Sequence, residues 1–457
     1  MTQHLTHQRA LSGSPDLLEL HALDPDRYPF LLASAAGASD EAQFDMLFAF
    51  PGETLVLDAQ GCLRLGPRIQ PDNDFLHALG GWCRSEGRQP ADDPGLPFCG
   101  GWFVYAAYEL ANQIEPWLDL PAANGPVASA VRIPAAIIQN RATGATQIVA
   151  ESDRAELIDL ICADVAAIAG PRSGVAARPA GGSLITGPPA EEDPERFLAA
   201  VSRVQEHIAA GDVYQANISR QWYAQLAADT RPWQIFERLR QANPAPFAGL
   251  ARLDDIVVVS SSPERLLRIR GSVIETRPIA GTRPRGQMID DRSLADELIA
   301  NPKERAEHVM LIDLERNDLG KVCTPGSVRI ADFMTIESYA HVHHIVSGVI
   351  GELRPEIGAA EALRAVFPGG TITGCPKPRC MALIRDIEQR PRGAYTGTFG
   401  YIGVDGRADF NILIRTIVLH DRQLTLAAGS GIVADSIPRH ELAETRAKAR
   451  GMLLALE

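Results

Sequence analysis

The sequence lacks the features that mark membrane-bound, secreted and nucleic-acid-binding proteins. It contains no run of about 18 uninterrupted apolar residues, and its start, MTQHLTHQRALSGS, has no basic segment followed by an apolar one. We therefore expect neither a membrane span nor a secretory signal, and a cytoplasmic protein. Positive charge is also in deficit. The formal net charge of −13 argues against nucleic acid or an anionic membrane as a partner.

The seven cysteines show no paired spacing. They lie at positions 62, 83, 99, 162, 323, 375 and 380. An odd number of cysteines scattered in this way favours reduced thiols over a disulfide framework. The last two lie close together but have no second pair and no histidine cluster beside them, so a zinc site is disfavoured.

A break in composition divides the chain. Residues 170–192 read GPRSGVAARPAGGSLITGPPAEE, a run rich in proline, glycine, alanine and serine. At 457 residues the chain is also too long for one ordinary hydrophobic core. We expect an amino-terminal companion domain over 1–170, a connection over 171–192, and a catalytic domain over 193–457.

The part after the break combines predicted strands and helices. Asp193 as a cap and Pro194 at the first helical position predict a helix start. The apolar patterns predict strands at 213–219, 255–261, 271–279, 399–404, 410–419 and 424–433, and helices at 303–316, 359–366, 377–388 and 440–454. Adjacent strands with helices between the groups indicate an α+β fold with largely antiparallel sheets.

Two of the predicted helices carry closely spaced carboxylates. An asparagine and a proline at 301–302 predict a helix start, and Glu304 and Glu307 then share one helix face. On the last predicted helix, the side chains that share a face are Glu441, Glu444 and Lys448. Two such helices facing each other could offer hard oxygen ligands to Mg²⁺. Taken singly, each is also the pattern of a solvent-exposed face with ordinary ion pairs.

The glycine-rich segments argue against one function and leave another open. FPGGTITGCPK (367–377) resembles a phosphate loop, but Cys375 and Pro376 follow its last glycine where that loop requires lysine. Binding of a nucleoside triphosphate is therefore disfavoured. This turn, and the glycines 429 and 431 at a strand end, could still present backbone N–H groups to a carboxylate.

Two further segments contain candidate acid–base groups. Within 261–286, Glu264 follows a proline at a strand end, in either a plain hairpin with a basic rim or an acid beside an anion-binding rim. In HVHHIVS (341–347), strand alternation places His344 on the opposite face from the other two histidines. The three therefore form no compact metal-ligand set, and a role for one of them as a general acid, base or orienting group is the better interpretation.

Together these segments resemble the chorismate-binding enzymes, the family of anthranilate, aminodeoxychorismate, isochorismate and salicylate synthases. The motifs are SPERLL, RPIAGTRPRG, NPKERAEHVMLIDLERNDLG, SYAHVHHIVS, FPGGTITGCPK, AYTGTFGYIG, ILIRT and AGSGIVADS followed by ExxExxxK. The resemblance extends to the amino-terminal part through FLLAS, FDMLFAFPG and PFCGGWFVYAAYELA. It implies a two-sheet α+β sandwich with helices on the outer faces and the active site between the sheets.

The resemblance also assigns roles to individual positions. It implies that Glu307 and Glu444 bind Mg²⁺ directly, with Glu304 and Glu441 nearby through water, and that the metal holds the C1 carboxylate of chorismate. It implies that Glu264 is the general acid for the C4 hydroxyl. The remaining implied contacts are Tyr395 and Arg415 with the enolpyruvyl carboxylate, Lys448 and the amides of Gly429 and Gly431 with the other carboxylate, and His344 and Thr371 with the ring.

One position bears on the nucleophile. Family members that add water to C2 carry a lysine base in a pattern like KVVLSR, and this chain reads QANISR with Gln215 in the place of the lysine. Glutamine cannot take a proton from water, whereas ammonia brings its own lone pair and needs only positioning. The resemblance therefore implies an enzyme that uses ammonia, and disfavours isochorismate and salicylate synthases.

The two ammonia-using branches divide the remaining features. Many aminodeoxychorismate synthases have PIKGT, whose lysine attacks C2 covalently, and here that position is Ala280, which is typical of anthranilate synthases. Three features favour aminodeoxychorismate synthase instead. Ala33 removes the carboxylate of the LLES feedback motif, FDMLFAFP (44–51) resembles the FDxxxA pattern, and Asn217 completes a YQxN strand. We expect aminodeoxychorismate synthase component I, with anthranilate synthase component I as the alternative.

The ammonia source is a further expectation. The sequence contains no nucleophile-elbow cysteine and no stretch that would form a glutamine amidotransferase domain. A separate glutaminase subunit is therefore the expected partner, and the chain is expected to work alone with ammonium salts. A sensor that binds chorismate without consuming it is the alternative class, but all the matched acid, anion and metal positions are present.

Overall fold

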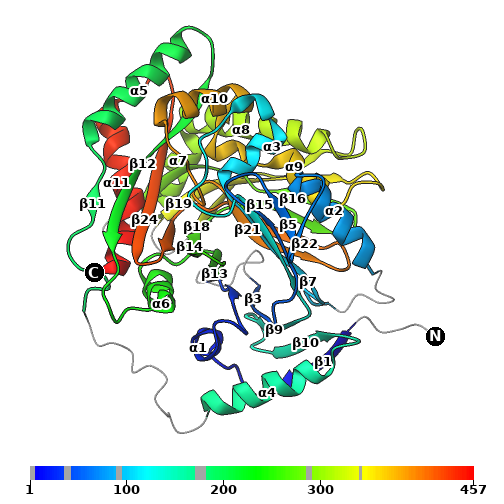
Figure 1. The fold of residues 1–457 in the computed structure, drawn as a ribbon. Helices are drawn as coiled ribbons and strands as arrows, with labels where there is room; N and C mark the ends of the chain where they lie inside the picture. The colour runs from blue at the N-terminus through cyan, green and yellow to red at the C-terminus, as the bar shows by residue number, and fades with distance from the viewer. Residues whose placement is uncertain (1–5, 35–42, 89–94, 170–181, 285–290, 339–341) are drawn as a thin grey trace.

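The computed structural model describes residues 6–34, 43–88, 95–169, 182–284, 291–338 and 342–457 (Figure 1). Within these residues the strands form two antiparallel sheets of 12 strands each. None of the described helices is long and apolar enough to cross a membrane.

The first sheet combines strands from both ends of the chain. Its order is β1 (Thr6–Leu11), β10 (Thr146–Glu151), β9 (Ala135–Asn140), β3 (Phe44–Ala49), β2 (Phe30–Leu32), β13 (Phe247–Arg252), β14 (Ile256–Ser262), β23 (Thr416–His420), β24 (Gln423–Ile432), β12 (Gln215–Gln225) and β11 (Ala190–Glu191), with β20 (Gly374–Cys375) on β12.

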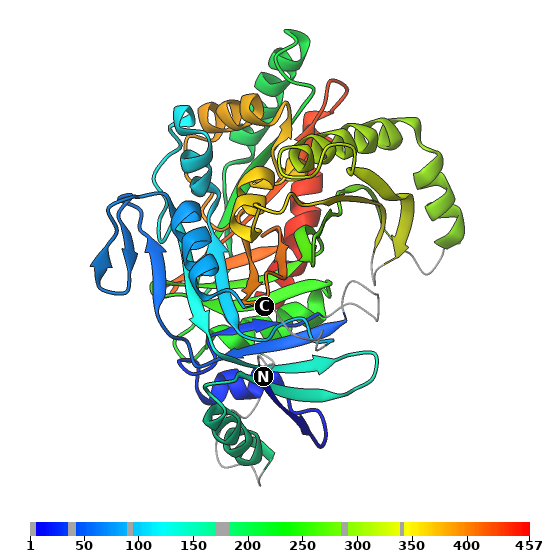
Figure 2. The same ribbon diagram turned by 90° about the vertical axis from the view of Figure 1, so that its right-hand side faces the viewer.

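The second sheet is built in the same way. Its order is β17 (Ile279–Pro284), β19 (Val342–Glu352), β16 (Val273–Thr276), β15 (Arg265–Arg270), β22 (Ala408–Asn411), β21 (Thr398–Gly403), β7 (Gly101–Ala106), β8 (Ala128–Ile133), β4 (Thr54–Leu57), β5 (Leu63–Leu65) and β6 (Arg68–Ile69), with β18 (Arg329–Ser338) on β19. Figure 2 shows its two ends at opposite sides of the molecule, the blue hairpin of β5 and β6 and the yellow-green region of β18.

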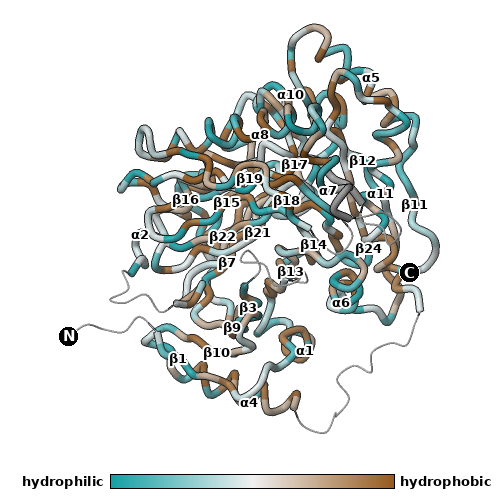
Figure 3. Tube along the Cα trace, turned by 180° about the vertical axis from the view of Figure 1, so that it is seen from behind, coloured by the Kyte–Doolittle hydropathy of each residue, from teal (hydrophilic) through white to brown (hydrophobic). Residues whose placement is uncertain are grey.

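The parts of the chain before and after the composition break share both sheets. Strand β2 pairs with β13 in the first sheet, and β7 pairs with β21 in the second. Aromatic side chains fill the space between the sheets, where Phe30 stacks on Phe103 with ring centroids 4.0 Å apart. Figure 3 shows hydrophobic residues, coloured brown, along β7, β21 and β22. This sandwich confirms the expected α+β two-sheet fold.

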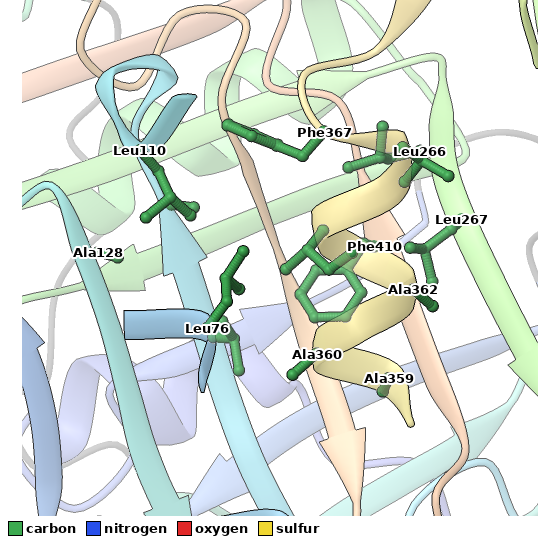
Figure 4. Close-up of a cluster of buried hydrophobic side chains, with 14 of the residues drawn as sticks. Leu76, Leu110, Ala128, Leu266, Leu267, Ala359, Ala360, Ala362, Phe367 and Phe410 are labelled. Atoms are coloured by element: carbon green, nitrogen blue, oxygen red, sulfur yellow. The ribbon is translucent and has the colours of Figure 1, made fainter. Parts of the chain in front are cut away.

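Helices cover the outer faces of the two sheets. The first sheet packs against α1 (Leu17–Leu23), α4 (Glu156–Ala169), α6 (Pro232–Ala242) and α11 (Pro438–Leu456). The second packs against α2 (Phe75–Glu86), α8 (Pro302–Gly320) and α9 (Ala359–Val366). Helix α10 (Lys377–Glu388) packs against β12 of the first sheet. Figure 4 shows Phe410 of β22 among the alanines of α9. The remaining helices are α3 (Ala111–Ile114), α5 (Pro194–Ala209) and α7 (Asp291–Ala300).

The helix-start signals in the sequence are confirmed. The side chain of Asp193 accepts the backbone N–H of Glu195 at the start of α5, at 3.0 Å. Asn301 accepts the N–H of Lys303 at 3.0 Å and so caps α8, the helix that carries the first carboxylate pair. Each cap satisfies an N–H group that has no partner within its own helix. The predicted helices at 359–366 and 377–388 match α9 and α10.

Two strand predictions need correction. The run 410–419 is not one strand, because β22 ends at Asn411 in the second sheet and β23 begins at Thr416 in the first. The link between them is buried at Ile412 and Leu413, so the apolar pattern continues although the strand does not. The run 271–279 is likewise divided, into β16 and the start of β17. The other four strand predictions match described strands.

Candidate active site

The candidate acid lies where the chain passes from one sheet to the other. Glu264 stands between β14 of the first sheet and β15 of the second, and is 4% exposed. Burial, together with the nearby carboxylate of Glu315, raises the pKa of Glu264 to about 7. The hydroxyl of Thr371, the backbone N–H of Ile279 and the guanidinium of Arg415 oppose this shift. Near neutral pH the Glu264 carboxyl group is therefore partly protonated and able to donate a proton.

Arg415 lies at the matching junction on the return path of the chain. It occupies the link between β22 and β23. Its φ of 52° is a left-handed backbone conformation that residues other than glycine rarely adopt. Its side chain interacts electrostatically with Tyr395, Glu444 and Glu264. Burial lowers the pKa of Arg415, but the ordinary value is so high that the guanidinium stays charged. It therefore supplies a fixed positive charge beside the candidate acid.

A glycine pair and two amides form the floor of the site. Gly431 lies opposite Asn217 in the pairing of β24 with β12. A Cβ at Gly429 would meet the amide oxygen of Asn217 at 2.6 Å and the hydroxyl of Tyr395 at 2.7 Å. A Cβ at Gly431 would meet Nε2 of Gln215 at 2.3 Å. Only glycine therefore lets these three polar side chains lie directly on the strand.

Several polar atoms of the site are buried without a hydrogen-bond partner among the described residues. They are Oε1 of Gln215, Oδ1 of Asn217, Oε1 of Glu264 and Oγ1 of Thr371. A buried polar atom left unpaired costs free energy, so native proteins retain such atoms where a ligand or water completes them. A ligand with N–H and O–H groups would satisfy these acceptors.

His344 and Lys448 border the same site. His344 is 6% exposed, and burial together with the charges of Arg415 and Lys448 lowers its pKa to about 4. Its Nδ1 lies 3.2 Å from the carbonyl oxygen of Gly281, next to Ala280. His344 is therefore neutral near pH 7, and a general acid role at that pH is disfavoured. The histidine before it contacts Ser338 instead, and His341 lies outside the described residues.

Lys448 connects the last helix to the glycine pair. Its Nζ donates to the carbonyl oxygen of Gly429 at 3.0 Å and lies 2.6 Å from Oε1 of Glu444. The Glu444 carboxylate keeps a lowered pKa because Lys448, the hydroxyl of Ser430 and Arg415 offset its burial. Glu444 and Lys448 therefore share one face of α11, as predicted, and Lys448 contacts the strand that carries the glycine pair.

Glu307 interacts electrostatically with two other candidate metal ligands, Glu304 and Glu441. Burial and the neighbouring Glu304 and Glu441 raise the pKa of Glu307 to about 7, with Lys303 opposing the shift. Among the described residues, no three His, Cys, Asp or Glu side chains lie close enough to hold a metal ion. The donor chemistry fits Mg²⁺, because hard carboxylate oxygens repel one another here and a divalent cation would neutralise them.

Reasoning from the sequence missed a buried ionic network behind these residues. Arg392 and Glu388 are each 4% exposed and form an ion pair with Nη2 and Oε1 2.7 Å apart. Glu315, whose pKa burial raises to about 7, was also missed. No local spacing signals these residues, since Glu388 to Arg392 reads as an ordinary i, i+4 pair at the end of a helix.

The sequence pattern of the chorismate binding enzymes matches residues 66–454. The chain belongs to this family. Aminodeoxychorismate synthase component 1 of Bacillus subtilis (strain 168) is 49% identical over 262 residues, which cover 57% of this chain and 55% of that protein. The chain thus spans about half the length of this relative.

Two further proteins that are similar to the chain are component I enzymes. Anthranilate synthase component 1 of Haloferax volcanii is 40% identical over 373 residues, with 78% of this chain and 70% of that protein covered. The crystal structure of anthranilate synthase component I from Streptococcus pneumoniae TIGR4 is similar with a TM-score of 0.79 at 27% identity, covering 91% of this chain and 93% of that one. These relatives divide between two products, so the family relationship alone does not assign one.

Proposed function

We propose that the chain is component I of an aminodeoxychorismate synthase. It converts chorismate and ammonia to 4-amino-4-deoxychorismate, which serves the synthesis of p-aminobenzoate and folate. The observation that carries the proposal is the pair of neutral amides, Gln215 and Asn217, that lies on the glycines of β24 where a lysine base would serve water addition. An amide oxygen accepts an N–H of ammonia but cannot activate water.

Cationic and neutral donors hold the two carboxylates of chorismate. Tyr395 and Arg415 bind the enolpyruvyl carboxylate, for which a planar guanidinium is suited because it can donate two parallel hydrogen bonds. Lys448 and the backbone N–H groups of Gly429 and Gly431 bind the ring carboxylate. The position of Arg415 near Tyr395 and of Lys448 against Gly429 supports this assignment.

Glu264 supplies the proton that the departing hydroxyl group needs. Its pKa near 7 leaves a useful fraction protonated at neutral pH. In the first step ammonia adds at C2, the two ring double bonds shift from C1=C2 and C5=C6 to C1=C6 and C4=C5, and the C4 hydroxyl takes the Glu264 proton and leaves as water. With Ala280 in place of a nucleophilic lysine, no covalent adduct forms. The added nitrogen returns a proton to Glu264. A second ammonia then adds at C4, the double bonds shift back to C1=C2 and C5=C6, and the C2 amine takes that proton and leaves as ammonia, which gives the 4-amino product.

Magnesium is the cofactor that this proposal includes. Glu307 and Glu444, with Glu304 and Glu441 nearby, would hold Mg²⁺, which neutralises the ring carboxylate and draws electron density from the ring. The mutual repulsion around Glu307 supports a cation at this place. Ammonia reaches the site from a separate glutamine amidotransferase subunit. The name of the Bacillus subtilis relative, component 1, supports the presence of a second component.

A specific observation favours the alternative product, anthranilate. Ala280 is 9% exposed on β17, in a position where anthranilate synthases also have alanine, and the relative from Haloferax volcanii is an anthranilate synthase component 1. Against it, Ala33 lacks a carboxylate and lines a pocket of about 70 Å³ with Ser34, Pro246 and Phe247. Asn217 in the amide pair also favours aminodeoxychorismate as the product.

Product analysis tests the proposal. The purified chain is incubated with chorismate, Mg²⁺ and ammonium, with a parallel sample in EDTA. We expect chorismate to disappear only with Mg²⁺, no pyruvate to form, and p-aminobenzoate to appear once an aminodeoxychorismate lyase is added. Release of pyruvate with a fluorescent product would establish anthranilate formation instead. Unconsumed chorismate in every sample would overturn both, and would leave a binding protein.

A further inference from the structure

A fully buried arginine lies directly behind the proposed ammonia and substrate contacts. Arg392 follows α10, and both of its terminal nitrogens and Nε are engaged. Nη2 and Nε donate to the two carboxylate oxygens of Glu388, at 2.7 and 3.1 Å. Glu388 keeps a lowered pKa in spite of its burial, because Arg392 and Arg390 lie beside it. The pair is therefore a fixed charge arrangement rather than a titrating one.

The remaining N–H bonds of Arg392 reach the backbone of two site segments. Nη2 donates to the carbonyl oxygen of Asn217 at 2.7 Å, and Nη1 donates to that of Ile372 at 3.1 Å. The first residue carries one of the proposed ammonia contacts, and the second is the neighbour of Thr371. One guanidinium thus fixes the distance between the amide strand and the turn beside Glu264.

The flat faces of the same guanidinium contact aromatic rings. Its central carbon lies 5.6 Å from the ring centroid of Tyr395 and 5.0 Å from that of Tyr108. A cation over the face of a tyrosine ring is attracted by the ring's negative face. Tyr395 is therefore held in the orientation that brings its hydroxyl close to Gly429.

The network is anchored at both of its ends. Glu388 accepts the backbone N–H of Ser219 at 2.8 Å, two residues along β12 from Asn217. On the other side, Glu109 accepts the backbone N–H groups of Arg392, at 2.7 Å, and of Gly393, at 3.1 Å. Glu109 belongs to the amino-terminal part of the chain, so that part contributes directly to the geometry behind the site.

We propose that Arg392 is a positioning residue for the amination reaction, acting through Asn217, the Thr371 turn and Tyr395 without touching the reacting atoms. The inference rests on the proposed function, because it concerns the contacts assigned there to ammonia and chorismate. Lysine cannot replace Arg392. Its single ammonium group cannot donate hydrogen bonds to Glu388 and to two backbone carbonyl groups at once, as the planar guanidinium does.

The test compares Arg392→Lys with a control substitution, Arg132→Lys, at a similar arginine elsewhere in the fold. Arg132 is also a largely buried arginine that lies between two carboxylates, Glu86 and Glu151, each at 2.6 Å, with its guanidinium over Trp102. We expect Arg392→Lys to lower kcat/KM for chorismate by about 100-fold and to raise KM for ammonium, because small misplacements of reacting groups have effects of that size. Arg132→Lys should lower Tm to a similar degree with both constants unchanged.

A double-mutant cycle separates positioning from general destabilisation. If Arg392 acts through Tyr395, the losses of Arg392→Lys and Tyr395→Phe are less than multiplicative in the double variant. Multiplicative losses, or an Arg392→Lys enzyme with wild-type constants, would overturn the inference. Where Arg392→Lys does not fold by near-ultraviolet circular dichroism, Glu388→Asp replaces it, with an expected loss of about tenfold. A wild-type chain that leaves chorismate unconsumed contradicts the proposed function instead, so the two failures are distinct.

Discussion

Two buried glutamates, Glu264 and Glu388, are equally inaccessible yet have opposite pKa shifts. Each is 4% exposed. The pKa of Glu264 is raised to about 7, because burial and Glu315 outweigh its few donors. The pKa of Glu388 is lowered, because two arginines and the N–H of Ser219 outweigh the same burial. Burial alone therefore does not decide the charge of a carboxylate, and the donors placed around it do.

The difference separates a reacting region from a supporting one. Around Glu388 both carboxylate oxygens and the nitrogens of its partner Arg392 have hydrogen-bond partners. Around Glu264 one carboxylate oxygen, the Thr371 hydroxyl and two amide oxygens of β12 have none among the described residues. The sequence places polar groups in both regions, but only one of them leaves acceptors for a ligand.

The substitution Glu264→Gln gives the largest expected effect. The amide cannot donate a carboxylic proton, so we expect kcat for chorismate consumption to fall by about 10²- to 10⁴-fold. Tm should not fall, because the amide avoids the desolvation of a buried charge. Chorismate loss followed by absorbance, with ammonium and Mg²⁺, measures the rate.

The matched control is Glu388→Gln, in the supporting region. This change leaves the buried charge of Arg392 without its carboxylate, which costs about 3–5 kcal/mol of the free energy of unfolding. It should therefore lower stability far more than Glu264→Gln does. Equal kcat for Glu264→Gln and the wild type would remove the general acid from the proposal.

The pH dependence of stability gives the second largest effect. The folded-state pKa of Glu264, about 7, lies above its ordinary 4.5, so the folded protein holds this proton more tightly than the unfolded one. Its contribution is complete below the ordinary pKa and is lost as the pH rises through 7. Glu264→Gln should therefore gain in free energy of unfolding relative to the wild type by about 3 kcal/mol over this range.

Urea unfolding at a series of pH values measures that gain. For Glu388 the sign is reversed, since its pKa is lowered in the folded protein. Its stabilisation is present above the ordinary pKa and is lost as the pH falls through the folded value. A Glu264→Gln protein whose advantage over the wild type does not change with pH would show that Glu264 has no raised pKa.

The sequence was sufficient for features that depend on near neighbours. Asp193 and Asn301 cap their helices as expected, because capping involves residues two or three positions away. The shared face of Glu444 and Lys448 follows from helical periodicity in the same way. The glycines at 429 and 431 could be identified as special, but not the side chains that require them.

The features that escaped prediction depend on distant contacts. Glu109 and Arg392 lie far apart in the chain, and the sequence around either residue does not predict their contact. The break between β22 and β23 was missed because Ile412 and Leu413 are buried where the chain crosses between sheets, so no polar turn residue marks it. A pattern of apolar residues indicates which residues are buried. It cannot separate a strand from this link, because the link between the two sheets is as buried as a strand.

The substitution Thr371→Val gives the smallest expected effect. It tests the boundary between the reacting region around Glu264 and the supporting region around Glu388. The Thr371 hydroxyl lowers the pKa of Glu264, so its removal should raise that pKa further. If the nearby hydroxyl stabilises the Glu264 carboxylate by about 1.4 kcal/mol, its removal shifts the alkaline limb of kcat upward by about one pH unit.

Thr373→Val is the control, because the hydroxyl of Thr373 donates to the carbonyl oxygen of Gly369, at 2.9 Å, rather than facing Glu264. It should leave the pH profile in place even where it lowers Tm. A downward shift in Thr371→Val, or the same shift in both variants, would mean that Thr371 does not set the proton affinity of Glu264. An upward shift confined to Thr371→Val would show that the reacting carboxyl is tuned by one weak donor, whereas Glu388 is fixed by several strong ones.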